Sequence, residues 1–321
     1  MKKRTPELTP NPSLPDDLLL TCFARVSRLY YPTLSLVSKS CRSLITSPEL
    51  YKTRSFLNHS ESCLYVCLKL PPDPNPRWFT LCRKPNRSLT NITKKKKKKK
   101  KKSSGSHTWH EAPSMLMERR YPVASVVDGK IYVVGGLKDF DSSKWMEVFD
   151  SKTQTWEFVL SPPTPVKRFI FWTAVIEEEI YMFGENGVAY KPEEDTWKSE
   201  VMSIGVVCHC VVDNVLYCYF DGINWYDSDI GHWIELKGLE GLPEFARYSN
   251  VFLVDYGGKI AVFWDKDLPS SGCKSRAIWC AVISLERCNN SREIQGNIEW
   301  LDVVLTVPYC YSFVNVLVAT V

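Results

Sequence analysis

The side chains that could bind a metal or carry out nucleophilic catalysis are scattered along this sequence. Twelve cysteines occur without a Cys-x-x-Cys pair, the nearest neighbours being Cys63/Cys67 and Cys208/Cys210. A structural zinc site needs four ligands at short spacings, and none of the five histidines is spaced from a cysteine pair as in a zinc finger. No Ser-His-Asp spacing or carboxylate pair stands out. We therefore expect no metal, no cofactor and no enzymatic activity.

The densest charge is a tract of nine consecutive lysines, Lys94 to Lys102. The 321-residue chain has a formal charge of +5, and subtracting these nine charges leaves −4 for the rest. Nine adjacent lysines repel one another and cannot form a buried strand, so residues 94–106 are predicted to be a solvated, flexible insert. A nuclear or nucleic-acid-binding role through the tract is an alternative, but it lacks the arginine and aromatic residues that would contact bases.

Neither end of the sequence has the pattern of a targeting or membrane segment. The basic residues 1–4 have no apolar region behind them, so we expect no secretory signal, reduced cysteines, and a cytoplasmic or nuclear protein. The uncharged stretch 303–321 is long enough to span a bilayer. However, Pro308, Ser312 and Asn315 interrupt it, and its residues are β-branched and aromatic. We expect two buried strands around a turn at Pro308 and no membrane partner.

Short helices are predicted over residues 12–57, after a disordered start at 1–11. The apolar run from Leu18 follows Pro15-Asp16-Asp17, and acidic side chains in a first turn face the free N–H groups of a helix. Ser47-Pro48 gives a further start, with a capping residue before a proline. About 45 residues make a marginal core, so these helices must pack on one another or on a partner.

Residues 107–321 contain internal repeats of an all-β unit. Three segments each join two apolar runs through a short polar turn, and their second runs carry Tyr132, Tyr181 and Tyr217. Each repeat also has an aromatic residue seven positions before a tryptophan, namely Phe149/Trp156, Tyr190/Trp197 and Tyr226/Trp233. Two hairpins per repeat give a four-stranded unit, which is what a β-propeller blade requires. The repeats lie near residues 118–157, 168–198, 205–236 and 248–303.

One repeat is truncated. Thr108-Trp109 matches Thr155-Trp156 at the end of a blade, but the lysine tract stands where its first hairpin should be. Strands predicted within 58–93 would close the ring by pairing with the last strand of the chain. We therefore predict about five blades, with a repeat of roughly 40 residues largely replaced.

Several of these residues carry a resemblance to a known family. Leu14-Pro15-Asp16-Asp17-Leu18-Leu19, residues 31–39 and Ser47-Pro48-Glu49-Leu50-Tyr51 resemble an F-box. The repeats, with Ile131-Tyr132-Val133-Val134-Gly135-Gly136, resemble kelch repeats. The chain as a whole resembles the plant F-box/kelch-repeat proteins. This resemblance implies a small all-α F-box followed by an all-β kelch-type β-propeller.

The resemblance also implies a function. Such a chain is a substrate-receptor subunit of a Skp–cullin–F-box ubiquitin ligase, in which the F-box docks on the Skp adaptor and through it on the cullin. The propeller holds the client protein to be ubiquitinated and performs no catalysis. By their place in the motif, the residues expected to contact the adaptor are Leu14, Pro15, Leu18, Leu19, Leu34, Leu36 and Val37. Packing inside the F-box is the alternative for Leu18, Leu19 and Leu36.

The client site has few signals in the sequence. Arg119, Arg120 and Arg168 precede inner strands and are candidates for its rim, with ordinary solvated charge as the alternative. The residues that the kelch pattern assigns to structure are Tyr132, Gly135, Gly136, Trp156, Tyr181, Trp197, Tyr217 and Trp233. We expect the tryptophans in the core, because they recur at the same place in each blade. A kelch-type copper oxidase, which the scattered histidines disfavour, and a degenerate member with impaired client binding are further alternatives.

Overall fold

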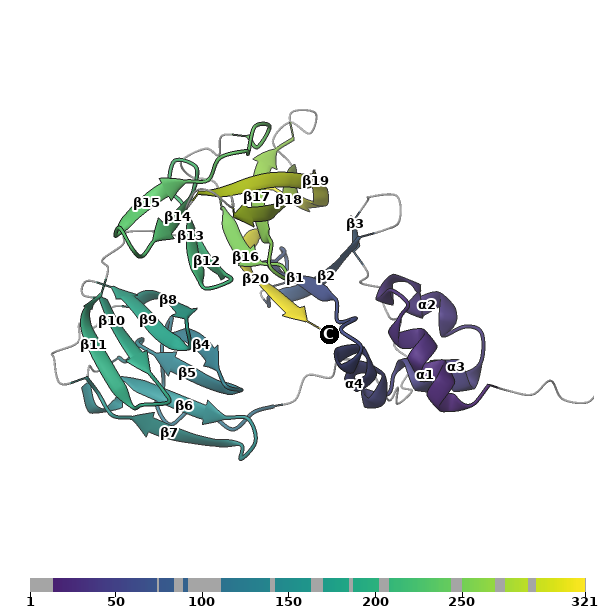
Figure 1. The fold of residues 1–321 in the computed structure, drawn as a ribbon, viewed down its shortest axis with the longest axis horizontal. Coiled ribbons are helices and arrows are strands. Elements are labelled where there is room, and N and C mark those ends of the chain that lie inside the picture. Colours follow the sequence, from purple (N-terminus) through teal and green to yellow (C-terminus); the bar gives the residue numbers. More distant parts are fainter. Residues whose placement is uncertain are drawn as a thin grey trace, which may run out of the picture. The chain divides into compact units, whose positions relative to one another are not determined.

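The computed structural model describes residues 14–73, 75–83, 89–91, 111–138, 142–162, 170–184, 187–201, 208–243, 250–268, 275–287 and 293–320. The chain divides into two compact units, one containing the N-terminal helices and one containing most of the β-structure. The predicted order of an all-α segment followed by an all-β segment is confirmed (Figure 1). Arg168 and the lysine tract lie outside the described residues.

The helical unit is made of short elements joined by tight turns. They are α1 (Asp16–Ala24), the 3-10 turn η1 (Arg28–Tyr30), α2 (Tyr31–Leu34), α3 (Lys39–Ile45) and α4 (Pro48–Phe56). The helix start predicted at Ser47 is confirmed, because its hydroxyl accepts a hydrogen bond from the Leu50 N–H at 3.4 Å. Ser38 caps α3 in the same way through the Cys41 N–H, at 2.9 Å. None of these helices is long enough to be stable alone, so their packing must hold them.

Within the described residues, the β-structure consists of five four-stranded sheets, as expected for a five-bladed β-propeller. Their strands, in spatial order, are β20 (Ser312–Thr320), β1 (Ser62–Lys69), β2 (Arg77–Arg83) and β3 (Leu89–Asn91); β4 (Val123–Val127), β5 (Lys130–Val134), β6 (Met146–Asp150) and β7 (Thr155–Val159); β8 (Ile170–Ile176), β9 (Glu179–Gly184), β10 (Gly187–Lys191) and β11 (Thr196–Val201); β12 (His209–Val212), β13 (Val215–Tyr219), β14 (Ile223–Asp227) and β15 (His232–Glu235); β16 (Phe252–Asp255), β17 (Ile260–Asp267), β18 (Ser275–Arg287) and β19 (Ile294–Pro308). A further 3-10 turn, η2 (Ser142–Lys144), precedes β6.

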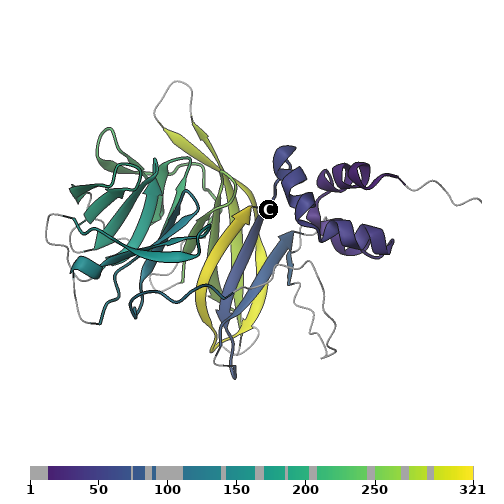
Figure 2. The ribbon, with the colours of Figure 1, turned by 90° about the horizontal axis from the view of Figure 1, so that it is seen from below.

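The last strand of the chain belongs to the same sheet as the first. β20 lies beside β1, although more than 240 residues separate them in the sequence (Figure 2). β19 and β20 flank the turn that follows Pro308, so the two strands predicted for the uncharged stretch are confirmed. Their predicted burial is wrong for β20, where Val314 and Leu317 are 45% and 48% exposed. In the part of the chain that the structure describes, no helix is long and apolar enough to cross a membrane.

The aromatic residues seven positions apart are cross-strand partners. Antiparallel pairing places Phe149 opposite Trp156, and the Tyr190/Trp197 and Tyr226/Trp233 pairs occupy the same place in their sheets. Their ring centroids lie 5.0, 4.6 and 5.3 Å apart. The spacing therefore reports a tight hairpin between the third and fourth strands, with aromatic pairs stabilising it.

The expectation that the tryptophans lie in the core holds only in part, because all three are only partly buried, while Trp197 and Trp233 pack against core clusters. They lie on the fourth strand of each sheet, and two of them use their indole N–H on a connecting segment. Trp156 Nε1 donates to the Pro113 carbonyl at 2.8 Å, and Trp197 Nε1 donates to the Leu160 carbonyl at 3.0 Å. Pro113 and Leu160 each follow a tryptophan by four residues in the sequence. The indoles thus attach successive repeats to one another.

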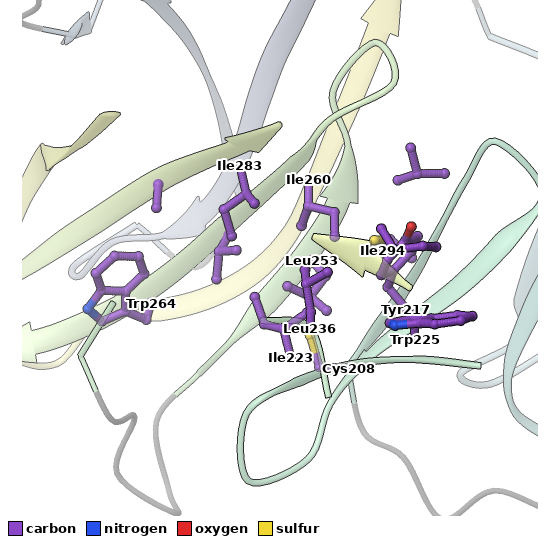
Figure 3. Close-up of a cluster of buried hydrophobic side chains, with 14 residues drawn as sticks. Cys208, Tyr217, Ile223, Trp225, Leu236, Leu253, Ile260, Trp264, Ile283 and Ile294 are labelled. Atoms are coloured by element: carbon purple, nitrogen blue, oxygen red, sulfur yellow. The ribbon is translucent and has the colours of Figure 1, made fainter. Parts of the chain in front are cut away.

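Hydrophobic clusters between neighbouring sheets form the core of the β unit. Tyr132 and Tyr190 share one cluster, which spans the sheets β4–β7 and β8–β11, and their rings lie 6.1 Å apart. Tyr217 and Trp264 share a second one, spanning β12–β15 and β16–β19 (Figure 3). Tyr181 is only half-buried and packs against a third cluster. Face-to-face packing of sheets explains why the second strands of three repeats carry a tyrosine.

Gly135 and Gly136 form the bend after β5, as the kelch pattern requires. Both have left-handed φ values, +76° and +73°. A Cβ at Gly136 would lie 2.5 Å from the Arg120 carbonyl oxygen, and the Arg120 N–H donates to the Gly136 carbonyl at 2.7 Å. Only glycine permits both the backbone conformation and this close approach.

Candidate binding surfaces

The helical unit exposes apolar side chains at the start of α1 and at the end of α2. Leu14 and Leu18 are more than half exposed, and Leu36 and Val37 are at least 70% exposed. Ser40 Oγ lies 3.5 Å from Asp16 Oδ1, so the chain that follows Val37 returns to the start of α1. The two exposed segments are therefore linked through this contact between the start of α1 and the start of α3. We call the four apolar side chains, together with exposed Pro15, the apolar helix surface.

Two residues of the predicted adaptor set are not part of this surface. Leu19 and Leu34 pack against the core of the helical unit, which consists of Phe23, Ala24, Tyr31, Ile45 and Leu50. Their partial burial follows from the helical period, since Leu19 points inward where Leu18 points to solvent. We therefore assign Leu19 and Leu34 to the core of the helical unit.

Arg54 holds the helical unit together, and sequence reasoning missed it. Its side chain is 1% exposed, and its Nη1 donates to the carbonyls of Ala24 and Val26 at 3.2 and 2.8 Å and to the Tyr31 hydroxyl at 2.9 Å. Nη2 donates to the His59 carbonyl at 2.6 Å and pairs with Glu61 at 3.1 Å. One guanidinium thus collects the backbone acceptors left at the end of α1 and after α4. No periodicity marks such a residue.

In the β unit, a cavity of about 580 Å³ lies against the first strands of three successive sheets. Its lining is Ser125, Thr173, Ala174, Val175, His209, Cys210, Val211, Asp213 and Asn214, from β4, β8, β12 and the turn after β12. β4, β8, β12 and β16 occupy the inner edges of their sheets (Figure 1). Ser125 Oγ donates to Thr173 Oγ1 at 2.9 Å and so joins β4 to β8. The size and position suit a binding site on the axis of the propeller.

His209, on β12, contributes a neutral imidazole ring to the wall of the cavity. Its ring packs against Trp172 at a tilt of 34°, with ring centroids 3.9 Å apart, and its Nε2 lies 3.0 Å from the Thr173 carbonyl oxygen. Burial lowers its pKa, and the bond to Thr173 offsets part of that effect. Burial also raises the pKa of the neighbouring Cys210 thiol well above its ordinary value, which disfavours the thiolate form.

Arg119 is not on the rim of a client site, and that prediction is corrected. Its side chain is 0% exposed and is paired at 2.7 Å with Glu147, which is also 0% exposed. The remaining donors bind the carbonyls of Gly135, Lys144 and Trp145 at 2.8–2.9 Å. All five guanidinium N–H groups are therefore used within the sheet β4–β7 and its loop. Arg120 is exposed and remains a candidate.

In the described part of the chain, no group of three or more histidine, cysteine, aspartate or glutamate side chains could hold a metal ion. The lining of the cavity offers hydroxyl, amide, imidazole and carboxylate groups.

Comparisons with known proteins agree with this architecture. A model of the F-box domain matches residues 12–53, and a model described as FKB95, Kelch-repeats domain, matches residues 103–305. The F-box/kelch-repeat protein At4g39550 of Arabidopsis thaliana is 53% identical over 373 aligned positions, covering 98% of this chain and 95% of that relative. The chain belongs to the F-box/kelch-repeat family. The family predicted from the sequence is thus confirmed, and the apolar helix surface is part of the F-box.

This F-box/kelch-repeat protein is shorter than its relatives within the matched region. The F-box/kelch-repeat protein At5g49000 of Arabidopsis thaliana is 55% identical over 367 aligned positions, covering 99% of this chain and 98% of the relative. The chain has only 321 residues, so at least 46 of those 367 positions have no counterpart in it. That deficit is close to the length of one kelch repeat, which is about 50 residues.

Proposed function

We propose that this chain is a substrate receptor of a Skp–cullin–F-box ubiquitin ligase, acting in the cytoplasm or nucleus. The F-box docks on the Skp adaptor and the propeller holds a client. The observation that carries this proposal is the apolar helix surface. Leu36 is 76% exposed and Val37 is 70% exposed, on a helical unit whose small core is filled by other side chains. Several exposed apolar side chains on one small unit are typical of a protein interface.

An exposed leucine outside the F-box provides a matched control. Leu160 follows β7 and is 75% exposed, nearly the same as Leu36. We expect Leu36→Asp to abolish co-purification of the Skp adaptor from plant cells and Leu160→Asp to leave it unchanged. Leu14→Ala combined with Pro15→Ala should also abolish it. Adaptor recovery at the wild-type level from Leu36→Asp would contradict the proposal, as would equal losses from both leucine variants.

The length deficit favours a second candidate, a family member with impaired client binding. We propose that the missing repeat lies at the lysine tract, where the sequence retains only the end of a blade, Thr108-Trp109. On that proposal the protein engages the adaptor but enriches no client. The test is co-purification of the wild-type chain and of a variant with an unfolded propeller. If both recover adaptor and cullin, and no client is enriched by the wild-type chain alone, this candidate is favoured over a working receptor.

A further inference from the structure

The cavity on the first strands has one charged group in its lining. Asp213 supplies a carboxylate, while no lysine or arginine belongs to the lining. Asp213 is exposed, and its side chain has no hydrogen bond or ion pair within the described residues. The other polar groups of the wall are the Ser125 and Thr173 hydroxyls, the Asn214 amide and the His209 ring. The wall is therefore complementary to a hydrogen-bond donor that carries a positive charge.

The turns beside the cavity add negative charge at the same end of the strands. The Glu177 N–H donates to Asn214 Oδ1 at 3.1 Å, so the turn after β8 touches the turn after β12. A Cβ at Gly258 would lie 3.9 Å from Asp213 Oδ2, so the turn after β16 is also adjacent. Exposed carboxylates on these turns and on the turn after β4 are Asp128, Glu177, Glu178 and Asp255.

Lys130 and Lys259, which lie at these turns, each face an acidic residue of their own sheet. Lys130 lies opposite Asp150 in the register of β5 and β6, and Lys259 Nζ binds Glu299 at 2.5 Å. Neither lysine belongs to the wall of the cavity. The carboxylates at the mouth therefore remain available to a cation from outside, and their combined field attracts one.

We propose that the cavity receives a lysine or arginine side chain from a basic, extended segment of the client protein. An aliphatic stem fits along Ala174, Val175 and Val211, while the ammonium or guanidinium group reaches Asp213 and the hydroxyls. The carboxylates of the neighbouring turns then contact the flanking basic residues. This inference rests on the proposed client-binding role of the propeller and names the chemistry of what it binds.

The test uses the full chain purified with its Skp adaptor and a fluorescein-labelled octapeptide of alternating lysine and serine. Fluorescence anisotropy measures Kd, and an octapeptide of alternating glutamate and serine serves as the peptide control. We expect Asp213→Asn to weaken binding roughly two- to fivefold, as for loss of a partly exposed charge pair. Adding Asp128→Asn should weaken it further, and binding should fall with added salt. Asparagine tolerates the left-handed backbone of both turns, with φ +48° at Asp213 and +49° at Asp128.

Asp221 provides the control variant. It lies between β13 and β14, at the opposite end of the same sheet from Asp213, with φ +54° and an exposed side chain. Asp221→Asn makes the same change of charge and should leave Kd unchanged. Equal effects of Asp213→Asn and Asp221→Asn, or no binding of the basic peptide, would overturn the inference. Adaptor co-purification is measured on the same samples, so its loss would count against the proposed function and not against the cavity.

The lysine tract of this chain is a competing occupant. A variant in which residues 94–102 are replaced by serine distinguishes the tract from a client as the occupant of the cavity. Binding of the basic peptide by the wild-type chain supports the client. If the peptide binds only after the tract is replaced, the cavity accepts a cationic segment of its own chain, and the assignment to a client is overturned.

Discussion

A buried arginine occurs in each of the two units, Arg54 in the F-box and Arg119 in the sheet β4–β7, and their surroundings differ. Arg119 pairs with Glu147, and both side chains are 0% exposed. Arg54 pairs with Glu61, whose side chain is 35% exposed. Every guanidinium N–H of Arg119 is bonded, whereas Arg54 Nε has no hydrogen-bond partner within the described residues.

The difference shows that the buried guanidinium group has a different structural role in each unit. In the blade, a dehydrated ion pair fixes the loop between β5 and β6, and removing one partner leaves a buried charge. In the F-box, the guanidinium mainly satisfies backbone carbonyls at helix ends, and its carboxylate partner still reaches water. The blade therefore depends on charge balance, and the F-box depends on hydrogen bonds to its carbonyls.

The largest effect is expected at Arg119. Arg119→Met should lower the free energy of unfolding of the propeller by about 3–5 kcal/mol, because Glu147 stays buried without a partner. Adding Glu147→Gln should restore part of the loss, since an amide oxygen still accepts the Leu116 N–H. Urea unfolding, with hydrogen exchange to locate the change in β4–β7, measures both. An Arg119→Met protein as stable as the wild type would contradict a structural role for the Arg119–Glu147 pair, and with it the difference between the two arginines.

A smaller effect is expected at Arg54. Arg54→Met should destabilise the F-box by about 2–3 kcal/mol, because several carbonyls lose their donor while Glu61 turns to solvent. Exposed Arg25, just after α1, is the control, and Arg25→Met should change stability by less than about 0.5 kcal/mol. Hydrogen exchange should rise in α1 and α4 and stay unchanged in the sheets. A loss equal to that of Arg119→Met would show that the two arginines do not differ.

The smallest effect on stability is expected at His209, which is buried and neutral, unlike the two charged arginines. The pKa of His209 is lowered by burial, so the unfolded chain binds a proton at a higher pH than the folded one. Stability should fall as the pH drops below about 6.5, the ordinary histidine value, and should level off once folded His209 is also protonated. His209→Gln should remove this step from a plot of unfolding free energy against pH. An unchanged pH dependence in that variant would contradict a neutral, buried His209.

Local interactions explain why much of this protein is predictable. The Phe149/Trp156 spacing reports two strands joined by a tight turn, and Asp128-Gly129 is the kind of pair that such turns require. Ser47-Pro48 caps a helix through the N–H three residues later. In each case the residues that interact lie a few positions apart, so the interaction can be predicted from the local sequence.

The candidate sites depend on contacts between distant residues, and prediction was weaker there. Arg119 and Glu147 are 28 positions apart, and Ser125 and Thr173, which join two walls of the cavity, are 48 apart. Arg119 has the same residue type and nearly the same position as Arg120, yet only Arg120 is exposed. A charge pattern therefore cannot tell a free arginine from a structural one, because burial decides it.

The sequence by itself determined the order of helices and blades, the hairpin pairs, the family and the mildly acidic body behind the lysine tract. Those features follow from short-range periodicity, turn residues and composition. Only the tertiary structure decided which F-box leucines are exposed, that Arg119 and Arg54 are buried, and that Asp213 stands in a cavity wall. Which side chains face water depends on how separate segments pack against one another, and packing is not a property of any one segment.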